Sequence, residues 1–435
     1  MQTSAASEVW DAAAETLPRQ ALRAVQLERL RATVGRVLER QPLMAERLAA
    51  AGVTSASDIG SLDDVARLPF STKSDLRSTY PFGLFTVPRE ELVRVHASSG
   101  THGKPTVVGY TRADLDVWTE VMARCMTMAG VRPGMVVHNA NNYGLFTGGH
   151  GFHQGAEKIG ATVVPVSGGF TARQAMLLRD LGGQVLVSTP SYALVIAQAV
   201  RDAGLTPSDL RLEVGLFGGE PSTEELRGEI ERQLGLAAIQ MYGLSEMCGP
   251  GVASECLTGR AGMHVQEDHF LVEVVDPDTG EVLPDGSEGE LVFSTLIKEA
   301  LPLLRYRTAD IAALVHEPCV CGRTFARIDR LRGRRDDMLI VRGVNLYPSH
   351  VEHVLLGVPD VAPHYQLVVR REGHMDEVAV HCEPAHAGVD RTALRDRVSS
   401  VLREHTGIRM DVRVLEVGAL PRSEGKAVRV VDQRG

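Results

Sequence analysis

The chain has 435 residues, of which 44% are hydrophobic and 23% charged, and its formal net charge is −9. This balance is typical of a folded globular protein and, at this length, of two or three domains. The negative charge argues against nucleic acid or an anionic membrane surface as the main partner. Six cysteines are too few for a disulfide scaffold in a chain of this size and indicate reduced thiols in a cytoplasmic protein.

The N-terminal region carries no targeting signal. Met1–Leu17 lacks a basic segment followed by an apolar stretch, so we expect no signal peptide. Nowhere do about eighteen apolar residues run together, so we expect no transmembrane helix. Between Leu22 and Val34 apolar residues recur near helical spacing, which predicts helices over roughly residues 1–50.

The middle of the chain alternates between β-rich and helical segments. The runs typical of buried parallel strands are VVHNAN (136–141), ATVVPVS (161–167), QVLVSTP (184–190) and EVGLFGG (213–219). Strand, helix and strand in series predict an α/β sheet that binds ligands at the carboxyl ends of its strands. Between about 262 and 330 the pattern becomes mostly β, which predicts a smaller β-subdomain.

The last hundred or so residues show a different pattern of predicted strands and helices. A strand (DMLIVRG), a helix opening at Pro348, a hairpin and an amphipathic helix follow one another. The apolar face of that last helix consists of Leu394, Val398, Val401 and Leu402. We therefore expect an N-terminal domain over residues 1–334 and a small α+β domain over residues 335–435.

A glycine-rich loop is the first segment whose residues suggest a binding or catalytic function. It consists of Ser98-Ser99-Gly100-Thr101-His102-Gly103-Lys104-Pro105-Thr106. Its glycines permit a tight turn with exposed backbone, its hydroxyls and amides can donate to phosphate oxygens, and its lysine supplies positive charge. The spacing is not that of a Walker A loop, and a solvated surface turn is an equal alternative for this segment alone.

Two neighbouring strand ends form the next pair of segments. Gly218-Gly219-Glu220-Pro221 ends one predicted strand, and Gln240-Met241-Tyr242-Gly243-Leu244-Ser245-Glu246 ends the next. An aromatic ring, a glycine, a hydroxyl and a carboxylate in this order can stack a base, approach a phosphate and hold a cation. Each segment alone is explained better as an ordinary strand-ending turn.

Three further segments complete the set. The first, Leu304–Asp310, ends in a carboxylate that could accept hydrogen bonds from vicinal hydroxyls. The second, Gly333–Asp337, lies shortly before Arg342-Gly343. The third, Pro421–Lys426, places a lysine on a loop near the C-terminus. A lone lysine beside glycine is normally a solvated side chain.

In this fixed order the segments resemble the adenylate-forming superfamily, which comprises the acyl-CoA synthetases and adenylation domains. More narrowly, residues 60–435 look like the phenylacetate–CoA ligase branch. The resemblance rests on SSGTHGKPTVVGYT, YGLFTGGHGFHQGAEKIGATVVPVSGG, GLFGGEP, DDMLIVRGVNLYPSHVE and LPRSEGKAVRV. It implies a large N-terminal α/β domain with a β-subdomain and a small mobile α+β lid. It also implies ATP-dependent activation of an aromatic acid to an acyl-adenylate, followed by transfer to CoA.

The resemblance further implies a role for individual residues of the ATP site. The ATP phosphates would be bound by Ser98, Ser99, Gly100, Thr101, Gly103 and Lys104. The adenine slot would be formed by Gly218, Gly219, Glu220 and Tyr242, with Pro221 and Gly243 in the same ATP site. The ribose would be held by Asp310 and Arg334. Ser245 would bond the α-phosphate, Glu246 would ligate Mg²⁺, and Lys426 would bridge the acid and the α-phosphate as the main catalytic group. Asp336 would be the hinge. No general base is needed, because a carboxylic acid is already ionised near neutral pH.

The acid pocket of the family would contain Tyr143, Phe146, Gly148, His150, Phe152 and His153, together with Gly219 and Cys248. His150 and Phe152 stand where the branch usually has small residues, and His102 stands where it usually has threonine. A histidine in the pocket wall predicts an acid with a ring hydroxyl or amino group, such as a hydroxybenzoate, anthranilate or hydroxyanthranilate. A purely structural role for His150 is the equal alternative.

A metal site is expected from Cys256, His264, Cys319 and Cys321. Thiolates and imidazole suit tetrahedral Zn²⁺, and similar ligands occur in some members of the branch, so we expect a structural zinc. Reduced free cysteines are the alternative. Cys125, Cys248 and Cys382 are expected to behave as small buried hydrophobic residues.

Other functions are compatible with the same segments. One is a stand-alone adenylating ligase that passes its acyl group to an amine or to a carrier protein, which would be a separate chain. Another is a non-catalytic nucleotide-binding protein, although the presence of Lys426, Glu246 and Asp310 together argues against it. Small molecules are the expected partners, and a homodimer is left open.

Overall fold

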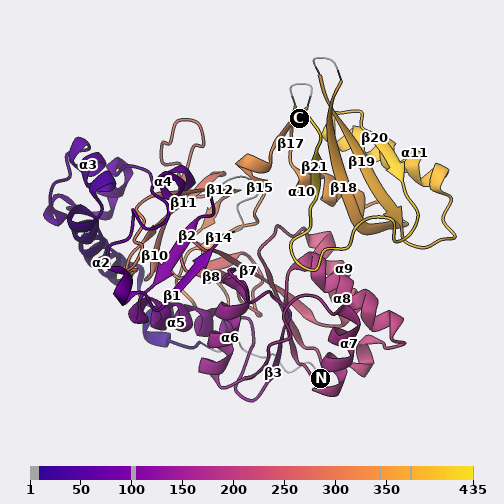
Figure 1. The fold of residues 1–435 in the computed structure, drawn as a ribbon, viewed down its shortest axis with the longest axis horizontal. Coiled ribbons are helices and arrows are strands. Elements are labelled where there is room, and N and C mark those ends of the chain that lie inside the picture. Colours follow the sequence, from indigo (N-terminus) through magenta and orange to yellow (C-terminus); the bar gives the residue numbers. More distant parts are fainter. Residues whose placement is uncertain (1–8, 99–103, 342–343, 373–374, 435) are drawn as a thin grey trace.

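The structure is a computed structural model that describes residues 9–98, 104–341, 344–372 and 375–434. A large N-terminal α/β domain is followed by a smaller C-terminal subdomain, drawn in yellow at the upper right of Figure 1. This arrangement confirms the expected fold class. No helix among the described residues has the length and apolar character that crossing a bilayer would need.

A nine-stranded sheet forms the centre of the large domain. Its strand order is β13-β14-β9-β8-β7-β6-β5-β3-β4, and the strands from β7 to β4 are parallel. The strands are β3 (Val136–Asn139), β4 (Thr162–Val164), β5 (Val185–Ser188), β6 (Val214–Gly218), β7 (Ala237–Leu244), β8 (Gly249–Glu255), β9 (Met263–Val265), β13 (Leu314–Val315) and β14 (Arg327–Ile328). The predicted parallel strands are thus confirmed, and the carboxyl ends of β6 and β7 lie side by side.

Helices cover this sheet and extend from it. Those along the sheet are α5 (Arg112–Met128), α6 (Gly148–Ile159), α7 (Thr171–Asp180), α8 (Pro190–Asp202) and α9 (Glu224–Leu234). The N-terminal helices are α1 (Ala12–Glu15), α2 (Arg19–Arg40), α3 (Pro42–Ala50) and α4 (Lys73–Ser78). Local sequence sets several helix starts: Thr111 and Asp114 form a capping box at α5, and Thr189 caps α8 ahead of Pro190. Short 3-10 turns occur at Ala56–Asp58, Leu62–Arg67, Arg89–Glu91, Pro207–Asp209 and Arg335–Asp337.

The segment expected to form one β-subdomain divides between two sheets. A four-stranded sheet contains β10 (Phe270–Val275), β11 (Gly289–Thr295), β12 (Tyr306–Ala312) and β15 (Gly333–Arg334). By contrast, β9, β13 and β14 extend the nine-stranded sheet, because β9 pairs with β8 on one side and with β14 on the other. The single subdomain over 262–330 is therefore corrected. A separate hairpin joins β1 (Arg94–Ala97) to β2 (Val107–Tyr110).

The C-terminal subdomain has its own hydrophobic core. Its elements are β16 (Leu339–Val341), β17 (Val344–Leu346), α10 (Pro348–Leu356), β18 (Val361–Glu372), β19 (Met375–Pro384), α11 (Arg391–Thr406), β20 (Asp411–Val414) and β21 (Val430–Asp432). Leu394, Val398 and Leu402 of α11 are buried in this core, as the apolar face of the helix predicted. The long hairpin β18–β19 was also predicted correctly.

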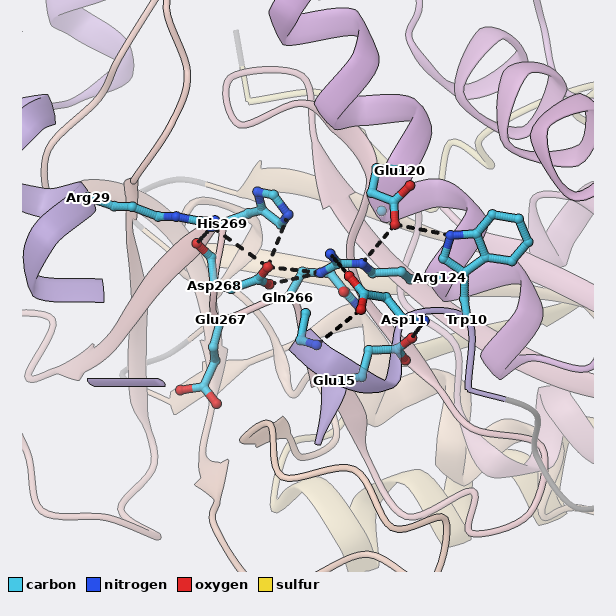
Figure 2. A network of polar contacts seen from close by, with 12 residues as sticks. Trp10, Asp11, Glu15, Arg29, Glu120, Arg124, Gln266, Glu267, Asp268 and His269 are labelled. Atoms are coloured by element: carbon cyan, nitrogen blue, oxygen red, sulfur yellow. Dashed lines mark hydrogen bonds and ion pairs between the residues drawn. The ribbon is translucent and has the colours of Figure 1, made fainter. Parts of the chain in front are cut away.

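A buried ionic network fastens the N-terminal segment to the large domain (Figure 2). The guanidinium of Arg124 on α5 pairs with Asp268 at 2.9 Å and with Asp11 at 2.9 Å, and the indole of Trp10 donates to Glu120 at 3.0 Å. Because Asp268 lies between β9 and β10, the network ties the start of the chain to the junction of the two large sheets.

Candidate active site

The glycines at the end of β6 allow two strand ends to approach closely. A Cβ on Gly218 would lie 2.4 Å from the carbonyl oxygen of Met241 on β7, so a side chain at 218 would collide with backbone. Gly219 has a φ of +86°, a conformation that glycine adopts without strain. The backbone of residues 218–219 is therefore exposed at the carboxyl edge of the sheet, where parallel α/β sheets bind ligands.

Glu220 connects this edge to the C-terminal loop that carries Lys426. One carboxylate oxygen accepts from the Ser191 amide at 2.6 Å, and the other accepts from the Ala427 amide at 2.9 Å. Thr189 adds a second link, because its hydroxyl donates to the Gly425 carbonyl at 2.9 Å. Thr189 and Ser191 were not among the site residues predicted from the sequence, although the threonine-proline start of α8 is a visible helix signal.

The side chain of Lys426 lies next to Gly219. A Cβ on Gly219 would be 3.5 Å from Cε of Lys426, so the glycine also leaves room for the lysine. Burial by the surrounding protein lowers the pKa of Lys426, and Arg334 lowers it further, while Glu220, Asp310 and Glu246 oppose the shift. The side chain itself remains open to solvent. The predicted catalytic lysine is thus brought together with three predicted carboxylates of the large domain.

Tyr242, Asp310 and Arg334 form a connected group beside this point. The Tyr242 hydroxyl donates to one oxygen of Asp310 at 2.6 Å, and Arg334 donates to the other at 3.1 Å. Asp310 and Arg334 face each other across the β12–β15 pair. Burial, followed by the charge of Asp310, holds the pKa of Tyr242 well above its usual value, so its hydroxyl stays a donor.

The turn after β7 carries Ser245 and Glu246. The Ser245 hydroxyl lies 3.3 Å from that of Thr147, and the Glu246 carboxylate accepts from the Tyr306 hydroxyl at 3.1 Å. The second oxygen of Glu246 has no hydrogen-bond partner among the described residues, so the buried carboxylate is able to ligate a cation. Tyr306 was missed by the sequence analysis, although it lies inside the segment that ends at Asp310.

The ends of the glycine-rich loop lie at the top of the β1–β2 hairpin. The Ser98 amide donates to the Thr106 carbonyl at 2.9 Å, and the Lys104 ammonium lies 5.4 Å from the centre of the Tyr80 ring. Ala97 joins this hairpin to the predicted acid pocket, since its amide donates to the Leu145 carbonyl at 3.1 Å. Ser99, Gly100, Thr101 and Gly103 lie outside the described residues.

Three of the predicted acid-pocket residues form an aromatic group. Nε2 of His150 lies 2.6 Å from the carbonyl of Tyr143, whose hydroxyl lies 3.1 Å from Nδ1 of His153. The buried ring of His96 packs 5.2 Å from that of His150. Burial lowers the pKa of both rings, and that of His96 falls to about 4, so both are neutral at pH 7.

The remaining pocket residues are less closely grouped. Phe146 is 41% exposed, whereas Phe152 is 3% exposed and packs in the main core, so its contact with a substrate stays a prediction. Gly148 begins α6. Cys248 is buried, and burial raises its pKa to about 12, so it does not act as a thiolate.

The four predicted metal ligands are gathered in one place. All their ligand atoms lie within 4.8 Å of one another. The sulfurs of Cys256 and Cys319 are 3.6 Å apart, and that of Cys321 lies 3.4 Å from Nε2 of His264. Zn–S bonds of about 2.3 Å in a tetrahedron place sulfurs about 3.8 Å apart, whereas a disulfide requires about 2.05 Å. These spacings fit a zinc site and exclude a disulfide.

The chemistry of this cluster also fits a metal. A hydrogen bond from Cys256 lowers the pKa of Cys321 and raises that of Cys256. Nδ1 of His264 is buried, and it has no hydrogen-bond partner within the part of the chain that the structure describes. A Cβ on Gly259 would lie 2.8 Å from the Cys319 sulfur, so only glycine fits against the cluster.

The predicted hinge residue, Asp336, lies in the 3-10 turn Arg335–Asp337. Arg335 holds the turn to the large domain through an ion pair with Asp278 at 2.6 Å. Arg342 and Gly343, which follow this turn in the sequence, lie outside the described residues.

Comparison with known families and proteins gives consistent matches. A family model described as AMP-binding enzyme matches residues 14–296, and one described as AMP-binding enzyme C-terminal domain matches residues 343–434. The phenylacetate-coenzyme A ligase of Thermus thermophilus is 52% identical over 97% of this chain and 98% of its own length. That of Escherichia coli is 47% identical over 97% of each chain.

Solved structures of 2-hydroxyisobutyryl-CoA ligase resemble the whole chain. Its postadenylation complex with 2-HIB-AMP has a TM-score of 0.93 at 29% identity, covering 100% of this chain and 94% of that one. Its complex with 2-HIB-AMP and CoA in the thioesterification state has a TM-score of 0.74 at 30% identity, with the same coverage. The arrangement of the two domains here is therefore closer to the postadenylation structure.

Proposed function

Because this chain belongs to the AMP-binding enzyme family, within its phenylacetate–CoA ligase-like branch, we propose that it activates an aromatic carboxylic acid of the phenylacetate type. It is an AMP-forming ligase that makes an acyl-CoA by way of an acyl-adenylate. Its relatives named phenylacetate-coenzyme A ligase, at 46–52% identity, support phenylacetate as the first candidate acid.

The position of Lys426 is the observation that carries the proposed site. A lysine on a C-terminal loop ordinarily has no partner in a distant domain, whereas this one, although open to solvent, lies against Gly219, in the electrostatic field of Glu220, Asp310 and Glu246. Placed there, its ammonium can neutralise charge shared between a bound carboxylate and a neighbouring phosphate.

The proposed reaction has two steps. The carboxylate of the acid attacks the α-phosphorus of ATP, a P–O bond forms, and pyrophosphate leaves. The CoA thiol then loses its proton and attacks the acyl carbon, and AMP leaves with the oxygen that had linked it to the acyl group. Negative charge gathers in the first step, so positioning and charge stabilisation supply most of the catalysis.

The residues of the ATP site have matching proposed tasks. Asp310, oriented by Tyr242 and Arg334, accepts from the ribose hydroxyls. Ser245 donates to the α-phosphate, while Gly218, Gly219 and Glu220 line the adenine slot. Glu246 would hold a magnesium ion, which supplies positive charge for the pyrophosphate.

A second candidate acid follows from the hydrogen bonding of His150. A carbonyl only accepts, so Nε2 of this neutral ring carries the hydrogen that is donated to Tyr143. Nδ1 is then an acceptor, and it could bind a ring hydroxyl or amino group of the acid. This supports hydroxybenzoates and aminobenzoates, whereas the engaged Nε2 supports the structural role that was the alternative for His150.

The test is acid-dependent pyrophosphate release with and without CoA. The panel contains phenylacetate, benzoate, 2- and 3-hydroxybenzoate, anthranilate and 3-hydroxyanthranilate. We expect phenylacetate to have the highest kcat/KM and His150→Leu to leave that ranking unchanged. The exposed lid variant His386→Leu is the matched control.

Three outcomes would change the assignment. A preference of roughly tenfold or more for a hydroxylated or aminated benzoate, lost in His150→Leu, would establish the second candidate. Pyrophosphate release that no aromatic acid stimulates would contradict an aromatic substrate altogether. Formation of thioester only with a carrier protein would replace CoA as the acceptor.

A further inference from the structure

Lys298 is a buried lysine without a role in the proposed chemistry. It lies in the apolar run Leu296–Leu304, and 8% of its surface is exposed. Its ammonium donates to the carbonyl of Glu246 at 3.0 Å and to that of Met247 at 2.7 Å. It also lies 5.0 Å from the centre of the Tyr110 ring. Burying a lysine has a large desolvation cost, so a position that holds one requires specific compensating contacts.

Tyr110 completes the same set of contacts. Its hydroxyl lies 3.0 Å from the carbonyl of Cys248 and 3.5 Å from that of Ser245. Lys298 and Tyr110 together therefore face all four consecutive carbonyls of the turn 245–248. This turn carries the two side chains assigned to the α-phosphate and the magnesium ion.

A second layer fixes Lys298 itself. The carboxylate of Asp114 accepts from the amides of Glu299 at 2.6 Å and Ala300 at 2.9 Å. Asp114 also forms the capping box with Thr111 at the start of α5, and the Thr111 hydroxyl donates to Glu299 at 2.8 Å. The backbone beside Lys298 is thus bound to a helix start that follows Tyr110 directly in the chain.

Solvent has little room to replace these bonds. The cavity beside Lys298, Tyr110 and Cys248 has a volume of about 20 Å³, which accommodates about one water molecule. His269, which also lines this cavity, is held 3.2 Å from Asp268 of the buried network in Figure 2. Removal of the ammonium would leave two carbonyls without their lysine donor, beside a cavity that admits about one water molecule.

We propose that Lys298 is a positioning residue for adenylation, which holds the turn 245–248 so that Ser245 and Glu246 meet the α-phosphate and the magnesium ion. The inference rests on the proposed roles of these two residues. Lys298 touches neither substrate, and it acts through the backbone of the turn.

The experiment compares two partial reactions in the full chain. ATP–pyrophosphate exchange is measured against Mg²⁺ concentration, and thioester formation is measured from supplied acyl-adenylate and CoA. Lys298→Met, which keeps most of the side-chain volume, should raise the half-saturating Mg²⁺ concentration and lower the exchange rate by roughly tenfold to a hundredfold. Thioester formation should change by less than about threefold, because it needs no magnesium ion on Glu246.

Matched variants separate positioning from folding. Lys158→Met removes an ammonium that pairs with Glu120 at 2.7 Å on the surface, and it should behave as wild type. Tyr110→Phe removes the other donor to the turn, and it should shift the Mg²⁺ dependence in the same direction as Lys298→Met. If Lys298→Met does not fold, Tyr110→Phe decides the question.

The following results would refute the positioning role of Lys298 or its premise. A folded Lys298→Met with wild-type Mg²⁺ dependence, or with equal losses in both partial reactions, refutes the positioning role. If Lys298→Met does not fold, wild-type Mg²⁺ dependence in Tyr110→Phe refutes it instead. Glu246→Gln tests the premise separately: an unchanged Mg²⁺ dependence in that variant would refute the role of Glu246 itself.

Discussion

Lys426 is held in the candidate site by contacts distant in sequence, and charged groups around it act on its pKa in opposite directions. The loop that carries it is bound at both sides of the lysine, through Gly425 and Ala427, to Thr189 and Glu220 of the large domain. Burial and Arg334 lower its pKa, and the carboxylates of Glu220, Asp310 and Glu246 offset part of this lowering.

Replacement of Lys426 by alanine should affect one half-reaction. Adenylation should fall by roughly a hundredfold to a thousandfold, because a charge aimed at the developing negative charge is lost. Thioester formation from supplied acyl-adenylate should persist, since the lysine is proposed to act only in the first step. The two rates are measured as pyrophosphate exchange and as acyl-CoA release. An equal loss in both would contradict the division of labour between the two steps.

The candidate site was predicted from the order of its segments and the family resemblance that this order carries, since most of the segments alone were explained better as ordinary turns or solvated side chains. The side chains that the structure brings together at the strand ends, among them Gly219, Glu220, Asp310 and Lys426, were all named from the sequence. Lys298 and Tyr306 were not, because their partners lie about fifty to sixty residues earlier in the chain. A lone lysine in an apolar run is the one signal that could have directed attention to position 298.

At the level of elements, long periodic segments were predicted well and short ones were not. The parallel strands and the hairpin β18–β19 have clear apolar patterns. In contrast, β13 and β14 contain two residues each, too few for any period to appear. Contacts distant in sequence decide their pairing. The sequence pattern therefore could not show that the expected β-subdomain divides between two sheets.

The same pairing creates the cluster of Cys256, His264, Cys319 and Cys321. His264 on β9 faces Ser254 on β8 and Arg327 on β14, so the strands bring Cys256 toward the segment 319–321. We expect about one tightly bound Zn²⁺ per chain. In Cys319→Ser the zinc should be lost and the melting temperature should fall by about 5 °C or more, because a structural metal contributes directly to folding free energy.

Metal analysis and thermal unfolding check this expectation. Val320→Ser is the matched control, since Val320 lies between the two cysteines but is 79% exposed. Activity per folded molecule should change little in either variant, because the cluster includes no residue assigned to ATP or the acid. Protein purified without chelator and found to hold no zinc would refute the metal assignment.

For the whole molecule, we expect the arrangement of the C-terminal lid to change between the two half-reactions. The lid contacts the large domain through Lys426's loop and through the His353–Glu225 pair, whose atoms are 2.9 Å apart. The arrangement of the two domains matches the postadenylation structure of 2-hydroxyisobutyryl-CoA ligase more closely than its thioesterification structure. We therefore expect these contacts to serve the adenylation step. Exposed ion pairs contribute about 0–1 kcal/mol, so such contacts can form and break within one cycle.

Asp336 is where a change of lid arrangement should be most easily blocked. The residue lies in the 3-10 turn Arg335–Asp337, and proline fixes φ near −65°, a value typical of such turns. Asp336→Pro should therefore retain most of the pyrophosphate exchange but lower thioester formation by roughly tenfold or more, because the backbone resists rotation. Asp336→Ala, which leaves φ free, should retain both activities. If Asp336→Pro forms thioester from supplied acyl-adenylate at the wild-type rate, rotation at this residue is not required.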